Sequence, residues 1–240
     1  MRELALRERQ GPRVYQEQNM LNLIQKYRSE LVMSALVAQL LASPVADRNA
    51  HIGGALALVV LALLFVGSSY SVNEKRERLV LVVLTAVWIT MRLGEAFDGS
   101  RHIFSALAPI SGLLLSCAVL RIILDRFGMI PKVTGSVISE AFMGYLVIAI
   151  AFSQLYSILN MHLESPFNQV IPASKTSTLL YFSMITLSSV GYGGIVPVNP
   201  YLRITAALES MIGIFYVAVV VARLVSAYRP RTSTIITNEA

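Results

Sequence analysis

The stretch from Thr176 to Gly194 reads TSTLLYFSMITLSSVGYGG, an apolar segment followed by a turn of small residues. The apolar part, Thr176–Leu187, has helical character but gives only about 18 Å of helix, because each residue adds about 1.5 Å. The hydrocarbon core of a bilayer is about 30 Å thick. A helix this short cannot cross it. It can enter from one face and stop partway if its backbone is buried in protein or lines an aqueous cavity.

The turn from Ser188 to Gly193 is rich in small residues, and a backbone of this kind can bind a cation that has lost its water. Such an ion needs oxygens in place of its hydration shell, and successive backbone carbonyls supply them if all point the same way. That requires alternating backbone conformations with positive φ, which glycine adopts at little cost. Gly191 and Gly193 occupy alternate positions, and the Ser189 hydroxyl offers a further, innermost ligand. The alternative is an ordinary tight turn between two membrane helices.

The letters from Thr186 to Gly194 resemble the signature of the potassium channel family, T-x-T-T-V-G-Y-G-D. Serines 188 and 189 stand where the family has threonines, and Gly194 stands where it has an acidic residue. The resemblance implies a selectivity filter. Its potassium-binding residues would be Ser189, Val190, Gly191, Tyr192 and Gly193. Ser188 would support the pore from the end of the preceding helix.

Tyr192 should point away from the pore axis and pack against aromatic residues of the short helix. The candidates are Tyr181 and Phe182, in a neighbouring subunit. In the family the acidic residue after the filter holds its outer end, which Gly194 cannot do. We therefore expect rapid loss of conduction in low external potassium, or reduced discrimination against sodium. The competing possibility is that Tyr181 or another group supplies the missing restraint.

The last apolar block, Leu208–Val225, reads LESMIGIFYVAVVVARLV and resembles the inner helix of bacterial potassium channels with one pore segment per chain. Gly213 lies where that family has a hinge glycine, so the resemblance implies a role in gating. Close helix packing through a small residue is the alternative. Glu209 in the outer part of a span is costly unless paired or hydrated, and we expect it to support the filter from behind.

The composition places the whole chain among membrane proteins. It is 55% hydrophobic and only 14% charged, whereas soluble domains are about a quarter charged. A single cysteine, Cys117, excludes an internal disulfide framework. The apolar blocks that we interpret as spans are Leu31–Val45, Ile52–Tyr70, Leu79–Phe97, Ile103–Leu124, Val137–Asn160 and Ile204–Ser226.

The positions of the basic residues favour six spans. With both chain ends inside, most of the 20 Lys and Arg residues lie on the inner side. If the short block 31–45 does not span, fewer than half of them do, contrary to the positive-inside rule. We expect a multi-pass protein of the plasma membrane with cytoplasmic N- and C-termini. No arginine series occurs in Ile103–Leu120, so we expect no voltage sensor.

The predicted fold class is an all-α membrane protein with six transmembrane helices and a re-entrant pore helix and filter between the last two. The predicted parts are a cytoplasmic, partly amphipathic segment 1–30, a four-helix membrane domain 31–126, a pore domain 137–228 and a short cytoplasmic tail 229–240. One filter per chain cannot surround an ion, so we expect a homotetramer. Membrane lipid is the other expected partner, with no nucleic acid and no soluble protein.

The predicted function is passive, potassium-selective conduction, with potassium ions as the permeant ligand and no cofactor. A weakly selective cation channel is the nearest alternative, because Gly194 and the two serines depart from the signature. A potassium transporter subunit is a further alternative, although such systems resemble four linked pore repeats in one long chain. We do not expect an enzyme, because the sequence has no metal-spaced histidine cluster and no phosphate-binding loop.

Overall fold

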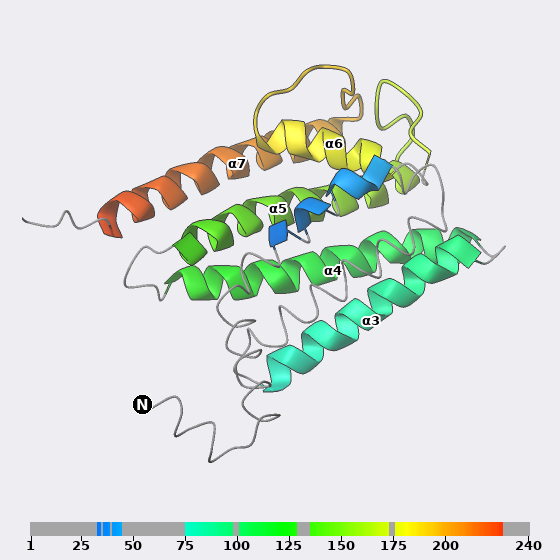
Figure 1. Ribbon diagram of the computed structural model, residues 1–240. Coiled ribbons are helices and arrows are strands. Elements are labelled where there is room, and N and C mark those ends of the chain that lie inside the picture. The colour runs from blue at the N-terminus through cyan, green and yellow to red at the C-terminus, as the bar shows by residue number, and fades with distance from the viewer. Residues whose placement is uncertain are drawn as a thin grey trace, which may run out of the picture.

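The computed structural model describes residues 33–44 except 35 and 39, and residues 75–97, 101–128, 135–172 and 176–227. Over these residues the chain is helical, and the only strand-like feature is an isolated bridge between Phe167 and Pro197. The named helices are α3 (Lys75–Phe97), α4 (Arg101–Gly128), α5 (Gly135–His162), α6 (Thr176–Leu187) and α7 (Pro200–Ala227) (Figure 1). The predicted all-helical class is confirmed for this part of the chain.

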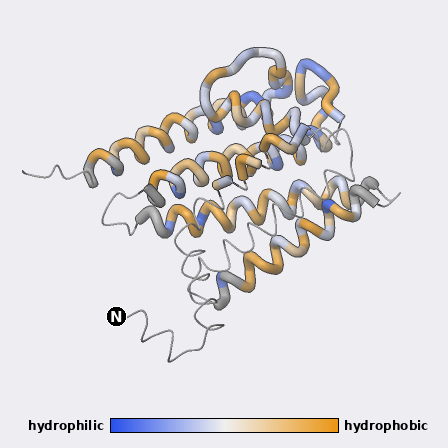
Figure 2. The backbone as a smooth tube through the Cα atoms, viewed as in Figure 1, coloured by the Kyte–Doolittle hydropathy of each residue, from blue (hydrophilic) through white to orange (hydrophobic). Residues whose placement is uncertain are grey.

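Among the residues that the structure describes, three helices are long and apolar enough to cross a membrane, judged by length and composition. These segments are Phe104–Asp125 in α4, Ile138–His162 in α5 and Pro200–Arg223 in α7. Each overlaps a block that the sequence predicts as a span, and Figure 2 shows apolar residues along most of α7. A helix pairs its backbone N–H and C=O groups within itself, which matters in a membrane because lipid tails offer these groups no hydrogen-bond partners. The chain therefore has the helices of a membrane protein.

The other three predicted spans are described only in part. The block Leu79–Phe97 lies within α3, whose apolar portion is the shorter segment Leu79–Gly94. Residues 33–44 are helical where they are described. The block Ile52–Tyr70 and the predicted terminal segments 1–30 and 229–240 lie outside the described residues. The count of six spans stays a prediction.

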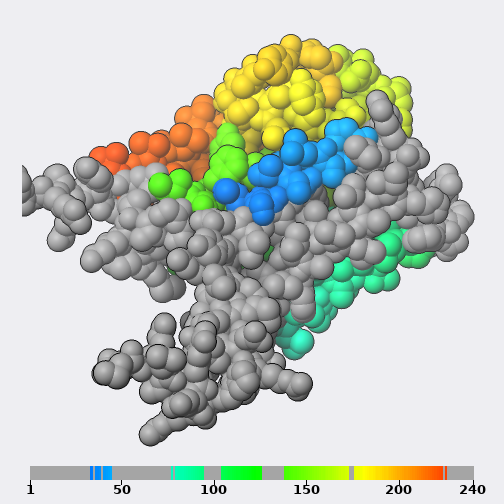
Figure 3. Space-filling view, in the orientation of Figure 1, coloured from blue at the N-terminus to red at the C-terminus, as the bar shows by residue number. Residues whose placement is uncertain are grey.

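Helix α5 is the centre of the arrangement. It packs against α4, α6 and α7, while α3 packs against α4 (Figure 1). The described residues of 33–44 lie on the face of the molecule that the space-filling view shows (Figure 3), and Leu36 shares a buried cluster with Met143 and Val147 of α5. In the spanning segment of α5, 61% is buried, against 11% for α7. Helix α5 is thus a core helix, whereas α7 turns most of its side chains outward.

Candidate functional site

The short helix α6 lies between α5 and α7 and leads directly into the glycine-rich turn. It runs from Thr176 to Leu187, the bounds that the sequence predicts, and its 12 residues are too few to span a bilayer. Its buried residues are Leu179, Leu180, Phe182, Ser183, Ile185 and Leu187. Packing against α5 and α7 therefore holds α6 in place.

Hydrogen bonds at the C-terminal end of α6 fix the start of the turn. The Ile185 carbonyl accepts from the backbone N–H of Val190 at 2.9 Å and of Gly191 at 3.2 Å. The Ser188 hydroxyl donates to the Met184 carbonyl at 2.7 Å. These bonds supply partners for carbonyls that the end of a helix leaves unpaired. The chain consequently leaves α6 in a fixed direction.

The backbone of the turn alternates between two conformations. Ser189, Gly191 and Gly193 have positive φ values of 58°, 53° and 79°, whereas Val190 and Tyr192 between them do not. The positive φ that the sequence predicts at the two glycines is thus present. Such alternation directs successive carbonyls to one side of the chain, where they can ligate a cation together. Positive φ at Ser189 costs about 1–2 kcal/mol, a strain of the kind that marks functional backbone.

The side chains of Val190 and Tyr192 in the turn are largely exposed. Tyr192 is 74% exposed and Val190 is 52% exposed. At Gly191, Gly193 and Gly194, no heavy atom of the described residues lies within 4 Å of the position that a Cβ would take. Apolar and aromatic groups usually gain stability by burial. The turn therefore offers these side chains to something outside the chain.

Glu209 of α7 is fully buried behind α6 and joins three helices. Its Oε2 accepts a hydrogen bond from the Tyr156 hydroxyl of α5 at 2.6 Å, and its Oε1 contacts the Ser183 hydroxyl of α6. The Ser183 hydroxyl also lies 2.7 Å from the Ala149 carbonyl of α5. A buried carboxyl group is tolerated when its oxygens are bonded in this way. Glu209 therefore ties α5, α6 and α7 together, and its predicted role in supporting a filter stays a prediction.

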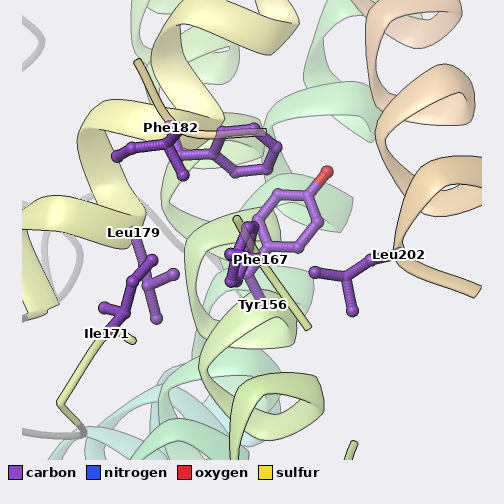
Figure 4. Close-up of a cluster of buried hydrophobic side chains, with 7 residues drawn as sticks. Tyr156, Phe167, Ile171, Leu179, Phe182 and Leu202 are labelled. Carbon is purple, nitrogen blue, oxygen red and sulfur yellow. The ribbon is translucent and has the colours of Figure 1, made fainter. Parts of the chain in front are cut away.

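An aromatic cluster lies beside this carboxyl group (Figure 4). The ring of Phe182 is 4.9 Å from that of Tyr156 and 5.2 Å from that of Phe167, both approached edge to face. Phe182 is 3% exposed, because its ring is packed inside this chain. The expected contact between an aromatic residue of α6 and the Tyr192 of a neighbouring subunit stays a prediction, and the ring of Phe182 is already covered by this chain. Tyr181, which is 44% exposed, is the aromatic residue that α6 turns outward.

Gly213 allows α7 to approach the end of α6 closely. A Cβ on Gly213 would overlap the carbonyl oxygen of Leu187 and lie 2.9 Å from its carbonyl carbon. Further along α7, the Tyr216 hydroxyl donates to the Ala141 carbonyl of α5 at 2.7 Å. It fills a notch at Gly144, where a Cβ would collide with it. This contact favours close helix packing, rather than hinge motion, as the role of Gly213.

Two polar residues near the turn were not singled out from the sequence. The Ser210 hydroxyl of α7 lies 2.9 Å from that of Ser189. In the loop before α6, the Asn168 side chain accepts from the backbone N–H of Val196 at 2.9 Å. Neither residue belongs to a recognisable motif. In the sequence, only their positions could have pointed to them. Ser210 follows Glu209, and Asn168 lies in a short polar loop.

Residues 144–229 match the model of a family described as an ion channel. This region is similar to an ion channel. It covers most of α5, all of α6, the turn and α7, so the contacts described for the turn and for Glu209 fall within the channel-like region. No curated protein and no solved structure matches the chain.

The match favours a membrane transport protein over an enzyme. Within the part of the chain that the structure describes, no group of three or more His, Cys, Asp or Glu side chains is placed to hold a metal ion. The oxygens available to a cation at the turn are instead backbone carbonyls and serine hydroxyls. Such neutral oxygens suit a weakly held, monovalent ion.

Proposed function

We propose that the chain is one subunit of a fourfold, potassium-selective channel whose filter is Ser188–Gly193. The observation that carries this proposal is the alternation of φ along Ser189–Gly193 in a turn that is exposed at the end of a short, buried helix. In the proposed channel, carbonyls of this turn replace the water around potassium. The C-terminal end of α6, with its partial negative charge, adds to the attraction for a cation.

The conformation of the turn supports a fourfold assembly. One chain can present ligands from a single direction, so an ion is surrounded only when copies meet on a common axis. The exposed side chains of Val190 and Tyr192 support this assembly, because neighbouring copies would cover them. Tyr181 on the outward side of α6 is then the partner that we expect for the Tyr192 of an adjacent copy.

The proposed layout has six spans, α6 as a re-entrant pore helix, and both chain ends in the cytoplasm of a cell with the channel in its plasma membrane. The proposed channel is not steeply voltage dependent. Arg121, near the inner end of α4, is 3.7 Å from Asp125, and both side chains are largely exposed. An exposed pair at a helix end is typical of an interfacial anchor and carries little energy.

Selectivity is tested directly by the reversal potential of the purified protein in planar bilayers, with potassium on one side and sodium on the other. We expect a large reversal potential of the sign that potassium permeation requires. A value near zero with sustained current would favour the weakly selective cation channel, for which Gly194 and the two filter serines are the sequence argument. Strict coupling to a second ion would instead indicate a transporter.

The same bilayers test whether the turn conducts. Gly191→Ala should abolish potassium current while the assembly stays intact on gel filtration, because alanine at a φ of 53° is strained. Gly194→Ala is the comparison, since Gly194 does not have positive φ and has open space around it. It should keep measurable current. Normal current in Gly191→Ala would sink the assignment of the filter.

A further inference from the structure

Gly194 marks an abrupt change in packing just beyond the proposed filter. No described heavy atom lies within 4 Å of a Cβ built on this residue. The next residue, Ile195, is 8% exposed and shares the buried cluster of Tyr156 and Phe182. Since Gly194 has no side chain, any restraint on it must act through its backbone.

The loop before α6 supplies backbone partners for this segment. Residues 166–168 run antiparallel to residues 196–198, with an isolated bridge between Phe167 and Pro197. The backbone N–H of Asn168 donates to the Val196 carbonyl at 2.9 Å, and that of Val198 donates to the Pro166 carbonyl at 2.9 Å. The chain that leaves the filter is thus paired with the loop that precedes α6.

Asn168 adds two further contacts with its side-chain amide. Its Oδ1 accepts from the Val196 N–H at 2.9 Å, and its Nδ2 donates to the Gly194 carbonyl at a longer 3.4 Å. An asparagine amide has both an acceptor and a donor, so it can hold two points of one backbone segment at once. A carboxylate at this position could make only the first of these contacts.

The loop that carries Asn168 is itself anchored. Phe167 is 4% exposed and packs edge to face against Phe182, within the aromatic cluster of Figure 4. Ser165 has a positive φ of 46°, an uncommon conformation for a residue other than glycine. The buried ring on one side and the turned backbone on the other fix where the Asn168 side chain points.

We propose that Asn168 is the positioning residue that braces the outer end of the filter. This inference rests on the proposed function and answers the question that Gly194 raises. The brace acts from the loop before α6 and reaches the backbone of Gly194 and Val196. Because Asn168 restrains this segment, the wild-type channel should sustain current in low external potassium better than expected from the presence of Gly194 alone.

The test is the rate at which current decays when external potassium is lowered, measured in bilayers for the wild type and three variants. Asn168→Ala should speed the decay about threefold to tenfold, the effect of losing about one net hydrogen bond. Raising external potassium should slow the decay by mass action. Asn168→Asp keeps the acceptor for Val196 and loses the donor to Gly194, so its decay should be intermediate. Gln169→Ala, a change of the adjacent exposed amide, should decay as the wild type does.

A decay in Asn168→Ala equal to that of the wild type would overturn the brace. If Asn168→Ala carries no current, potassium is added to the purified variant and to the purified wild type. The rise in melting temperature that potassium causes is then compared between the two proteins. A smaller rise supports the brace, and an equal rise overturns it. A wild-type protein without potassium current would refute the proposed function instead, so the two failures are distinct.

Discussion

Ser189 adopts positive φ without being glycine, and its hydroxyl lies 2.9 Å from that of Ser210. The strain of about 1–2 kcal/mol is comparable to the roughly 0.5–1.5 kcal/mol that one hydrogen bond contributes. The bond also has a directional effect. A hydroxyl that ligates a cation directs its lone pairs at the ion and its proton elsewhere. Ser210 Oγ is placed to accept that proton.

Ser210→Ala should therefore weaken the innermost ion site without removing the filter. Ba²⁺, which is close to potassium in size and carries twice the charge, is a suitable probe when applied from the inner side. We expect its apparent affinity to fall about threefold to tenfold, the equivalent of one hydrogen bond. Ser210→Thr keeps a hydroxyl and serves as the matched control. Equal Ba²⁺ block in Ser210→Ala and the wild type would contradict the proposed orientation of Ser189.

Helix α7 touches the rest of the chain along one narrow seam. Its buried residues are Leu202, Glu209 and Gly213, whose spacing of seven and four places them on one face. Leu202 packs into the aromatic cluster, Glu209 binds α5 and α6, and Gly213 meets the end of α6. The seam therefore fixes α7 against the end of α6, while most of its other described side chains are exposed.

Glu209 tests the contribution of this seam to stability. In Glu209→Gln, the amide oxygen can accept from Tyr156 and the amide nitrogen can donate to Ser183, whose own proton then goes to Ala149. We expect this variant to stay close to the wild type in melting temperature.

Glu209→Ala, by contrast, leaves the buried Tyr156 hydroxyl without its partner, while the Ser183 hydroxyl keeps the Ala149 carbonyl. The free energy of unfolding should fall by about 1–3 kcal/mol, the cost of one buried polar group left unpaired. Thermal unfolding in detergent at fixed potassium measures the difference. Equal melting temperatures for the alanine and glutamine variants would show that Glu209 has no tethering role.

Gly213→Ala separates close packing from hinge motion. A methyl group at this position collides with the Leu187 carbonyl and must push the end of α6, next to the filter. We expect a changed reversal potential together with lower stability. Gly144→Ala is the matched glycine change, because it displaces Tyr216 further along α7 and leaves the end of α6 alone. A Gly213→Ala channel with altered open probability and unchanged selectivity would restore the hinge interpretation.

The orientation of the molecule in the membrane is testable at the two ends of its long helices. Glu164 is exposed just beyond α5, on the side of the filter loop, and Asp125 is exposed near the end of α4. In a background with Cys117→Ser, an impermeant thiol reagent added outside should label Glu164→Cys in intact cells. Asp125→Cys should be labelled only after permeabilisation. The reverse pattern would invert the proposed topology.

The sequence predicts the parts of this molecule that depend on local pattern. The bounds of α6, the spanning segments of α4, α5 and α7, and positive φ at Gly191 and Gly193 all follow from apolar length and glycine spacing. The direction in which the Phe182 side chain points did not follow from the sequence. Helix α6 is apolar on nearly every side, so its pattern cannot distinguish the face toward α5 from the face turned outward.

The features that the sequence did not predict depend on contacts between distant segments of the chain. Asn168 and Val196 meet because a buried phenylalanine anchors the loop before α6, and Tyr156 meets Glu209 because three helices converge there. Hydrogen-bond partners 28 and 53 residues apart leave no periodic trace in the sequence. The short helix and the backbone conformation of the turn were thus predictable from the sequence, and the groups that hold them in place were not.

The unpacked turn at the end of α6 also bears on how the subunits find one another. In lipid, apolar helix faces gain little by leaving the bilayer, so association must draw on packing and on specific polar contacts. For the proposed channel, the permeant ion is such a contact, because its full set of ligands exists only when the copies are together. Potassium would then be a template for assembly as well as the cargo, and a cell low in potassium would hold more unassembled subunits.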